Sequence, residues 1–221
     1  MRSELFYTDA HQRVERETLL LLSQAPTLLS THTLESPRAV GDAVQAFLGV
    51  HFEQALGNLA SRYQADFARR AMADIAFEGS DGMYYIVDVK TRRHNTRFNM
   101  PNLTSVERLA RLYEDDRNVF ALLLVDYAIA GTLLHSEQVR FFPIEFISWE
   151  CLTIGALGWG QIQIANVSHL VVQMQSRRTW MLTLCERLLQ FYPREIDKIV
   201  QRMAHFKEVQ QAWVAREDTW G

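Results

Sequence analysis

The chain has 221 residues, of which 48% are hydrophobic and 22% are charged, and its formal net charge at pH 7 is −3. This composition is ordinary for a globular protein and excludes a low-complexity or disordered chain. The acidic balance also argues against a protein that binds nucleic acid through bulk positive charge. We expect a single domain over residues 1–221, with N-terminal helices over 1–65, a core over 66–130 and a strand and helix region over 131–221.

No segment of the sequence has the features of a membrane span or a secretory signal. The longest apolar runs, such as 121–125, are far shorter than the roughly eighteen residues that a membrane helix requires. Glu4 places an acid where a signal peptide would be basic and apolar. Cys151 and Cys185 cannot form a disulfide framework and lack the spacing of a metal site. We therefore expect a soluble cytoplasmic protein with no membrane contact.

Two helices are expected near the N-terminus. Helical spacing over 8–23 ends before Pro26, and a second helix is expected to begin at Ser36-Pro37 and to run to about Ala60. Between them, the Ser- and Thr-rich stretch 26–37 is typical of a linker. The apolar stripe of the second helix consists of Val40, Val44, Phe47, Leu48, Phe52 and Leu56.

A β-hairpin is expected next. The segments 72–77 and 83–89 are short, apolar and rich in residues that favour strands, and the Asp81-Gly82 pair between them is a strong turn signal. A polar loop is expected to follow over 91–102. The hairpin would bring side chains near the start of its first strand beside those at the end of its second.

The rest of the chain alternates between helix and strand signals. A helix is expected over 104–115, where Thr104 and Glu107 fit a capping box, and 119–125 has the unbroken apolar character of a strand buried on both faces. Further expected elements are strands over 139–142 and 161–167, a short helix over 143–152, and a helix over 177–214 that breaks before Pro193. This order predicts an α/β fold with a central mixed β-sheet flanked by helices.

Charged residues interrupt the apolar hairpin strands. Asp88 and Lys90 project from the same face of one strand, because side chains alternate along a strand. Asp74 lies among apolar neighbours on the other arm and can approach Asp88. Two converging carboxylates repel each other unless a cation lies between them, and a hard divalent ion such as Mg²⁺ suits oxygen ligands. Asp74 and Asp88 are therefore candidate metal ligands, together with Val89, which lies between Asp88 and Lys90 on the strand.

Lys90 and the basic run after it complete a chemical pattern. Beside a metal ion, Lys90 can hold or deprotonate a water molecule aimed at a scissile phosphate. The run from Lys90 to Arg97 carries four fixed positive charges and no acid, so it can follow a DNA backbone. Taken alone, the run is better explained as a solvated loop, and it is the strand before it that favours a role in DNA binding. Together these residues predict hydrolysis of a phosphodiester bond.

The segment from Tyr84 to about Ala110, which includes Tyr-Tyr-Ile-Val-Asp-Val-Lys, resembles the PD-(D/E)XK nuclease core, most closely type II restriction endonucleases of the HincII and EcoRV group. Weaker matches cover the helix opening near Asp42, residues 147–149 and 161–163, and the last helix. The resemblance implies that Asp74 and Asp88 bind metal and that Lys90 assists the attacking water. One departure is Ala73, which stands where the family name has proline. Asp42 is the candidate accessory acid, although solvation at the surface explains it better.

The resemblance also implies DNA contacts along the loop after the catalytic strand. The candidate DNA-binding residues are Arg92, Arg93, His94, Asn95, Arg97, Asn99, Asn102, Gln161 and Gln163. Arginines suit phosphates, whereas amide side chains suit base edges. Two alternatives stay open: Asn102 can cap a helix, and ordinary solvent-facing strand polarity explains Gln161 and Gln163.

The expected function is that of a Mg²⁺-dependent type II restriction endonuclease, a homodimer that cuts double-stranded DNA and leaves 5′-phosphate ends. The apolar run Leu19–Leu22 is the candidate dimer surface, with packing into the protein core as the alternative. The sequence contains no phosphate-cradling glycine loop, so no nucleotide cofactor is expected. A DNA repair or recombination nuclease with the same core, or a non-catalytic DNA-binding module, remain the alternatives.

Overall fold

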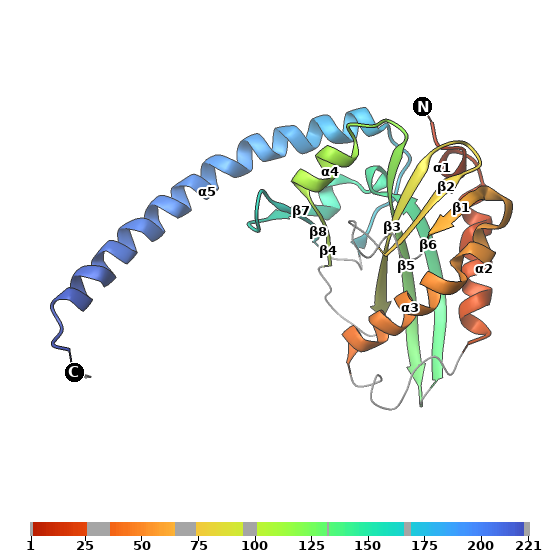
Figure 1. Cartoon of the computed structure of the whole chain (residues 1–221), viewed down its shortest axis with the longest axis horizontal. Helices are drawn as coiled ribbons and strands as arrows, with labels where there is room; N and C mark the ends of the chain where they lie inside the picture. The colour runs from red at the N-terminus through yellow and green to blue at the C-terminus, as the bar shows by residue number, and fades with distance from the viewer. Residues whose placement is uncertain are drawn as a thin grey trace. The chain divides into compact units, whose positions relative to one another are not determined.

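The computed structural model describes residues 2–25, 36–64, 74–94, 101–131, 133–165 and 169–218. The chain divides into two compact units, residues 1–176 and residues 177–221 (Figure 1). The first unit contains helices and a five-stranded mixed sheet. The second contains one long helix, α5 (Arg177–Val214). The predicted α/β class with a mixed central sheet and flanking helices is therefore confirmed.

The central sheet has the strand order β1-β2-β3-β5-β6. Its strands are β1 (Ala60–Gln64), β2 (Ile75–Gly79), β3 (Tyr84–Arg93), β5 (Asn118–Ala130) and β6 (Leu133–Pro143). β3 and β5 run parallel, while the other neighbouring strands pair antiparallel. β5 lies between β3 and β6, and its residues Val119–Tyr127 are all buried. The predicted strand with two buried faces is thus confirmed.

Helices α1 (Glu4–Tyr7), α2 (Ala10–Ser23) and α3 (Pro37–Leu56) cover one face of this sheet. Phe6 and Phe52 both pack edge-on against Phe141 of β6, with ring centroids 4.9 and 5.6 Å apart. α3 begins as predicted, with the Ser36 side chain accepting a hydrogen bond from the Ala39 amide. It ends at Leu56 and not at Ala60, because Gly57 turns the chain at a φ of +54° and Ala60 already pairs with β2.

The predicted hairpin is confirmed as β2 and β3. Gly82 has a φ of +76°, which favours glycine at this position, and the Asp81 carboxylate accepts a hydrogen bond from the Met83 amide at 3.1 Å. The second strand is longer than predicted, because Thr91–Arg93 continue the ladder with β5. The prediction that the loop begins at residue 91 is therefore wrong.

A second sheet has the order β4-β8-β7. It consists of β4 (Asn102–Ser105), β7 (Leu152–Gly155) and β8 (Gln161–Ile164), and α4 (Val106–Leu112) follows β4 directly. The predicted capping box at Thr104 is wrong. Thr104 pairs with Ile162 in the sheet, so the cap falls to Ser105, whose hydroxyl accepts a hydrogen bond from the Arg108 amide at 3.2 Å.

Two further expectations differ from the structure. The predicted short helix over 143–152 is instead two 3₁₀ turns, η3 (Ile144–Phe146) and η4 (Trp149–Cys151). The chain is extended at Ile147 and Ser148 between them, and the Ser148 hydroxyl begins the second turn by accepting a hydrogen bond from the Glu150 amide. α5 runs through Pro193 without a break, so the predicted break is wrong: the proline removes one main-chain hydrogen bond, but the helical turns on both sides of it continue. Within the described ranges, no helix combines the length and hydrophobicity needed to cross a membrane.

Candidate active site

Asp88 and Lys90 form an ion pair on β3. As strand alternation predicts, both side chains lie on one face, and Lys90 Nζ donates a hydrogen bond to Asp88 Oδ1 at 2.7 Å. The Asp88 side chain is 7% exposed and that of Lys90 is 25% exposed. Asp88 Oδ2 also lies 2.7 Å from Nζ, but it is buried and accepts no hydrogen bond from any described residue. The Lys90 ammonium group is thus the charged partner of both oxygens of this carboxylate.

Burial raises the pKa of the Asp88 carboxyl to about 7. The Lys90 ammonium and its hydrogen bond lower this pKa, while the charge of Asp74 raises it further. Burial therefore outweighs the favourable pair, and ionised Asp88 is held in the folded protein at a free-energy cost. Strongly raised pKa values of this kind are concentrated at functional sites.

Asp74 immediately precedes β2 and reaches the neighbouring strand. Its Oδ2 accepts a hydrogen bond from the Val89 amide at 2.8 Å, and its own amide donates to the Val87 carbonyl at 3.0 Å. Because β2 begins only at Ile75, the Val89 amide has no β2 ladder partner and is bound by this carboxylate instead. Burial raises the pKa of Asp74 as well. The hairpin therefore brings the two predicted acids into electrostatic contact.

Helix α3 supplies two further polar groups beside Asp74. Gln45 donates a hydrogen bond to Asp74 Oδ1, and the charge of Asp42 raises the pKa of the Asp74 carboxyl. The helix lies close to β3 here, since a Cβ atom added at Gly41 would lie 3.1 Å from Thr91 Oγ1. Gln45 was not predicted, because no local pattern connects it to an acid 29 residues away.

The donor set fits a magnesium ion. Asp74 and Asp88 are carboxylates, and Val89, whose amide Asp74 binds, has a main-chain carbonyl oxygen. Mg²⁺ is commonly bound through one or two carboxylates, with water and substrate phosphates completing its coordination. Across the residues with a described position, no group of three His, Cys, Asp or Glu side chains is arranged to hold a metal ion. Asp42 thus acts on Asp74 through its charge and does not complete a three-acid cluster.

Beyond Lys90, two of the basic residues, Arg92 at the end of β3 and His94 just after it, are paired with acids. Arg92 makes two hydrogen bonds, of 2.8 and 2.7 Å, to Asp126 of β5, and Arg140 of β6 lies 3.6 Å from the same carboxylate. His94 Nδ1 lies 2.7 Å from Glu137 Oε2. Asp126 was not predicted, although a charged residue that follows a long apolar run is a signal of a buried pair. The phosphate contacts of Arg92 and His94 stay predictions.

Three of the predicted DNA contacts lie on the small sheet. Asn102 and Gln163 face each other across β4 and β8, and Gln163 Nε2 donates to Asn102 Oδ1 at 2.5 Å. Gln161 and Gln163 are half-buried, whereas Ile162 and Ile164 between and after them are buried. This alternation leaves an uncharged polar face on the sheet. The remaining candidates Asn95, Arg97 and Asn99 lie outside the described residues.

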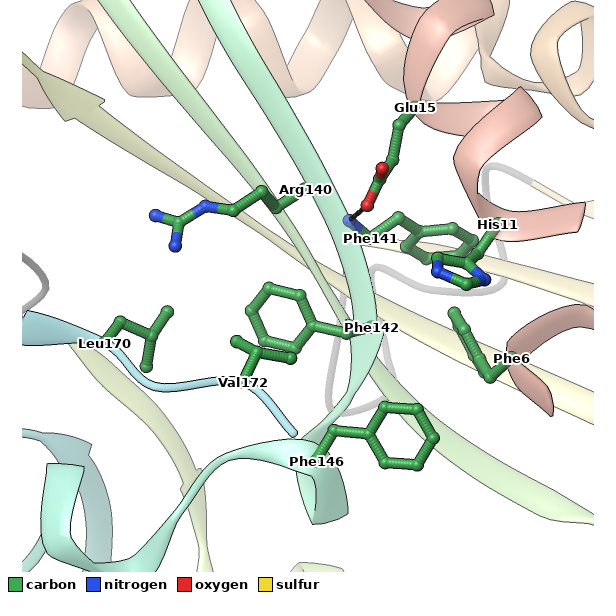
Figure 2. Close-up of a pocket in the computed structure, with 9 residues that line it drawn as sticks. All are labelled: Phe6, His11, Glu15, Arg140, Phe141, Phe142, Phe146, Leu170 and Val172. Carbon is green, nitrogen blue, oxygen red and sulfur yellow. Dashed lines mark hydrogen bonds between the residues drawn. The ribbon is translucent and has the colours of Figure 1, made fainter. Parts of the chain in front are cut away.

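A separate pocket of about 300 Å³ lies at the edge strand β6 (Figure 2). Glu15 Oε1 accepts a hydrogen bond from the outward-facing Phe141 amide at 2.7 Å, and burial raises the pKa of Glu15. Arg140 lines the pocket on the other side of the strand. The lining excludes Asp74, Asp88 and Lys90. Glu15 thus satisfies a free donor of the sheet edge, which is a structural role.

The sequence matches no protein-family model and no curated protein. The residues of the β2–β3 hairpin therefore carry the evidence for function. A buried acid, Asp88, a half-buried acid, Asp74, and Lys90 converge there.

Proposed function

We propose that this protein is a Mg²⁺-dependent endonuclease with a PD-(D/E)XK core, acting on double-stranded DNA as a type II restriction enzyme. The observation that carries the proposal is the surroundings of Asp88. Its carboxyl is 7% exposed, is paired with Lys90 and has a pKa of about 7 that the charge of Asp74 helps to raise. A protein that only binds DNA gains nothing from two acids beside a phosphate, because they repel it.

Each residue of the site has a role in phosphodiester hydrolysis. Asp74 and Asp88 would hold Mg²⁺, with the Val89 carbonyl as a third oxygen, and the bound ion would neutralise charge on the phosphoryl oxygens. Lys90 is kept beside Asp88 by a hydrogen bond of 2.7 Å, so its ammonium group is fixed near the scissile phosphate. There it orients the attacking water and stabilises the negative charge that develops on the phosphorus oxygens. The products are 5′-phosphate and 3′-hydroxyl ends.

DNA recognition is proposed to divide between charged and uncharged residues. β3 contains two arginines, and Arg92 is paired with Asp126. Within the described part of the chain no acid lies at ion-pair distance from Arg93, so its charge is available for phosphates. Asn102, Gln161 and Gln163 present amides, which both donate and accept hydrogen bonds and so suit base edges. Cutting a palindrome on both strands requires two active sites related by a two-fold axis, which supports a homodimer.

The run Leu19–Leu22 contributes less to such a dimer than its sequence suggests. Leu22 is buried in the core, and Leu20 is the exposed large side chain of the run, at 52%. One exposed leucine does not make an interface of ordinary size. That α2 forms a dimer surface stays a prediction.

Digestion of long, unmethylated DNA of mixed sequence in Mg²⁺ tests the proposal. The wild type should give discrete bands, and Asp88→Asn should cut at least about 10³-fold more slowly, the scale of losing an essential charged group. Asp115→Asn is a matched control, because Asp115 pairs with Arg117 at the surface, and this variant should cut like the wild type.

The other outcomes separate the alternatives. A smear of products would reject sequence specificity but keep the nuclease. A preference for branched or mismatched DNA would favour a repair or recombination enzyme. If the wild type cuts none of several DNAs with Mg²⁺ or Mn²⁺, yet binds them, the protein is a DNA-binding module and the enzymatic proposal is wrong.

A further inference from the structure

Apolar residues recur along α5 with alternating steps of three and four residues. The series, here called the α5 seam, consists of Leu182, Cys185, Leu189, Tyr192, Ile196, Ile199, Met203, Phe206, Gln210 and Trp213. Its large side chains are exposed to an unusual degree: Leu189 is 74%, Phe206 66% and Trp213 63% exposed. This spacing is the heptad pattern in which the first and fourth positions of each repeat form a narrow apolar stripe.

A stripe with a period of 3.5 residues is suited to another helix. The broader apolar face of a helix that packs on a sheet follows a period of 3.6, and the stripe would drift around such a helix within a few turns. The seam extends over about 46 Å, at 1.5 Å per residue. A membrane surface fits less well, because residues 186–208 carry five lysines and arginines and four acids, whereas helices that lie on anionic lipid have a basic polar face.

The seam is complementary to itself when two copies run in opposite directions. With the two-fold axis between residues 197 and 198, the two leucines of the seam meet tryptophan and phenylalanine, and the two polar positions meet each other. The facing pairs are Leu182 with Trp213, Leu189 with Phe206, Tyr192 with Met203, Ile196 with Ile199, and Cys185 with Gln210. A parallel pair would instead place tryptophan on tryptophan and glutamine on glutamine.

Charges beside the seam select the same direction. In antiparallel coiled coils, each of the two heptad positions that flank the stripe meets the same heptad position of the partner helix. This puts Glu195 opposite Arg202 and Glu186 opposite Lys207. Each of these contacts joins opposite charges and occurs twice by symmetry. In a parallel pair, Arg202 would face Lys207 and the two would repel each other. Flanking charges of this kind set the partner and the orientation of coiled coils.

We propose that α5 joins two copies of this chain as an antiparallel coiled coil. The seam contributes eight large apolar side chains per copy, which at roughly 100 Å² each reaches the approximately 800 Å² per partner of a standard interface. The contact is isologous, so the assembly closes at two copies. The inference rests on α5 alone and does not depend on the proposed nuclease activity.

Oligomeric state and direction can be measured on the full chain. Sedimentation of the wild type at micromolar concentration should give a dimer, and Ile196→Asp should give a monomer, since it places a charge at the centre of the seam. Gln201→Asp is the matched control, because residue 201 lies on the opposite side of the helix, and it should remain a dimer. Circular dichroism would verify that each variant keeps its helix. A wild-type monomer at all concentrations overturns the proposal, as does a monomer that binds anionic phosphatidylserine vesicles.

Cysteine cross-linking tests the direction. In the antiparallel pair the two Cys185 residues lie about 38 Å apart along the axis, so mild oxidation should not link wild-type copies. Gln210→Cys in a Cys151→Ala background should link Cys185 to the new cysteine of the partner and give a covalent dimer. A covalent dimer of the wild type through Cys185 would show a parallel pair and overturn the proposed arrangement.

A charge exchange gives an independent readout. Glu195→Arg should weaken the dimer at least tenfold by facing Arg202 of the other copy, and adding Arg202→Glu should restore it. Glu195 also pairs with Lys198 of its own helix at 2.6 Å, and this contact is lost in both variants. Recovery in the double variant therefore reports the contact between copies. Absence of recovery would contradict the proposed register.

Discussion

The end of β3 and the polar face of the small β4-β8-β7 sheet hold their polar groups in opposite surroundings. Asp88 is ionisable, 7% exposed and has a raised pKa, whereas Asn102 cannot ionise, is exposed and is hydrogen-bonded to Gln163. Burying a carboxylate costs free energy even when it is paired, while an exposed amide costs almost nothing. The buried acid of the first region therefore requires a functional explanation, whereas the amides of the second region suit either recognition of DNA or plain contact with water.

The largest expected difference between the two regions is in their response to pH. The pKa of Asp88 is raised from an ordinary 3.8 to about 7 in the folded protein, so folding favours its protonated form. Without metal, the contribution of Asp88 to the free energy of unfolding should be most favourable below about pH 4. It should be lost as the pH rises from about 4 through 7, because the unfolded state releases the proton first. The loss is on the order of 4 kcal/mol, at about 1.4 kcal/mol for each pKa unit.

Urea unfolding in EDTA between pH 4 and 8 measures this effect. Asp88→Asn should lack most of the decline and should be more stable than the wild type at pH 8. Asn102→Asp, on the exposed polar face, should show no comparable dependence. Parallel pH curves for the wild type and Asp88→Asn would contradict the buried, partly protonated state of Asp88.

A second contrast concerns buried and exposed ion pairs. Asp126 is 3% exposed and binds Arg92, so Asp126→Asn should destabilise the fold by about 3 kcal/mol because two arginines lose their counter-charge. The surface pair of Asp115 and Arg117 is exposed by 43% and 62%, and Asp115→Asn should leave the free energy of unfolding almost unchanged because solvent screens the pair. Chemical denaturation of both variants compares them directly, and equal costs would show that the Asp126 cluster contributes no more than a surface pair.

The small sheet should affect recognition and not stability. Asn102→Ala should reduce binding to the cognate site by about 1–3 kcal/mol relative to other DNA, the usual value of a good base contact. Measuring this in an Asp88→Asn background keeps the DNA intact. An unchanged ratio of cognate to non-cognate binding would leave the Asn102–Gln163 pair as ordinary strand polarity.

The smallest expected effect is that of a single phosphate contact. Arg93→Ala should weaken binding to all DNA by a similar factor and reduce the slope of log affinity against log salt by about one. Arg111→Ala serves as the control, since Arg111 is bound to Glu107 on α4 and should leave the slope unchanged. A sequence-dependent effect of Arg93→Ala would assign this residue to the bases instead.

Sequence alone determined the features that depend on neighbours along the chain. The Asp81-Gly82 turn follows from the backbone freedom of glycine and from an aspartate whose carboxylate accepts a hydrogen bond from the Met83 amide. The shared face of Asp88 and Lys90 follows from the two-residue period of a strand. The start of α3 follows from Ser36, whose side chain caps the helix, and from Pro37, whose backbone angle is preset for it. Each of these is a local property of a few residues.

Tertiary structure decided the contacts between distant segments. Arg92 meets Asp126 only because β3 and β5 pair in parallel with residues 92 and 126 in register. Gln45 reaches Asp74 only because α3 lies against the end of β3. Ser105 caps α4 because Thr104 is held in the ladder with β8. Propensity and periodicity do not encode strand order or register, since these depend on how the whole apolar surface is buried.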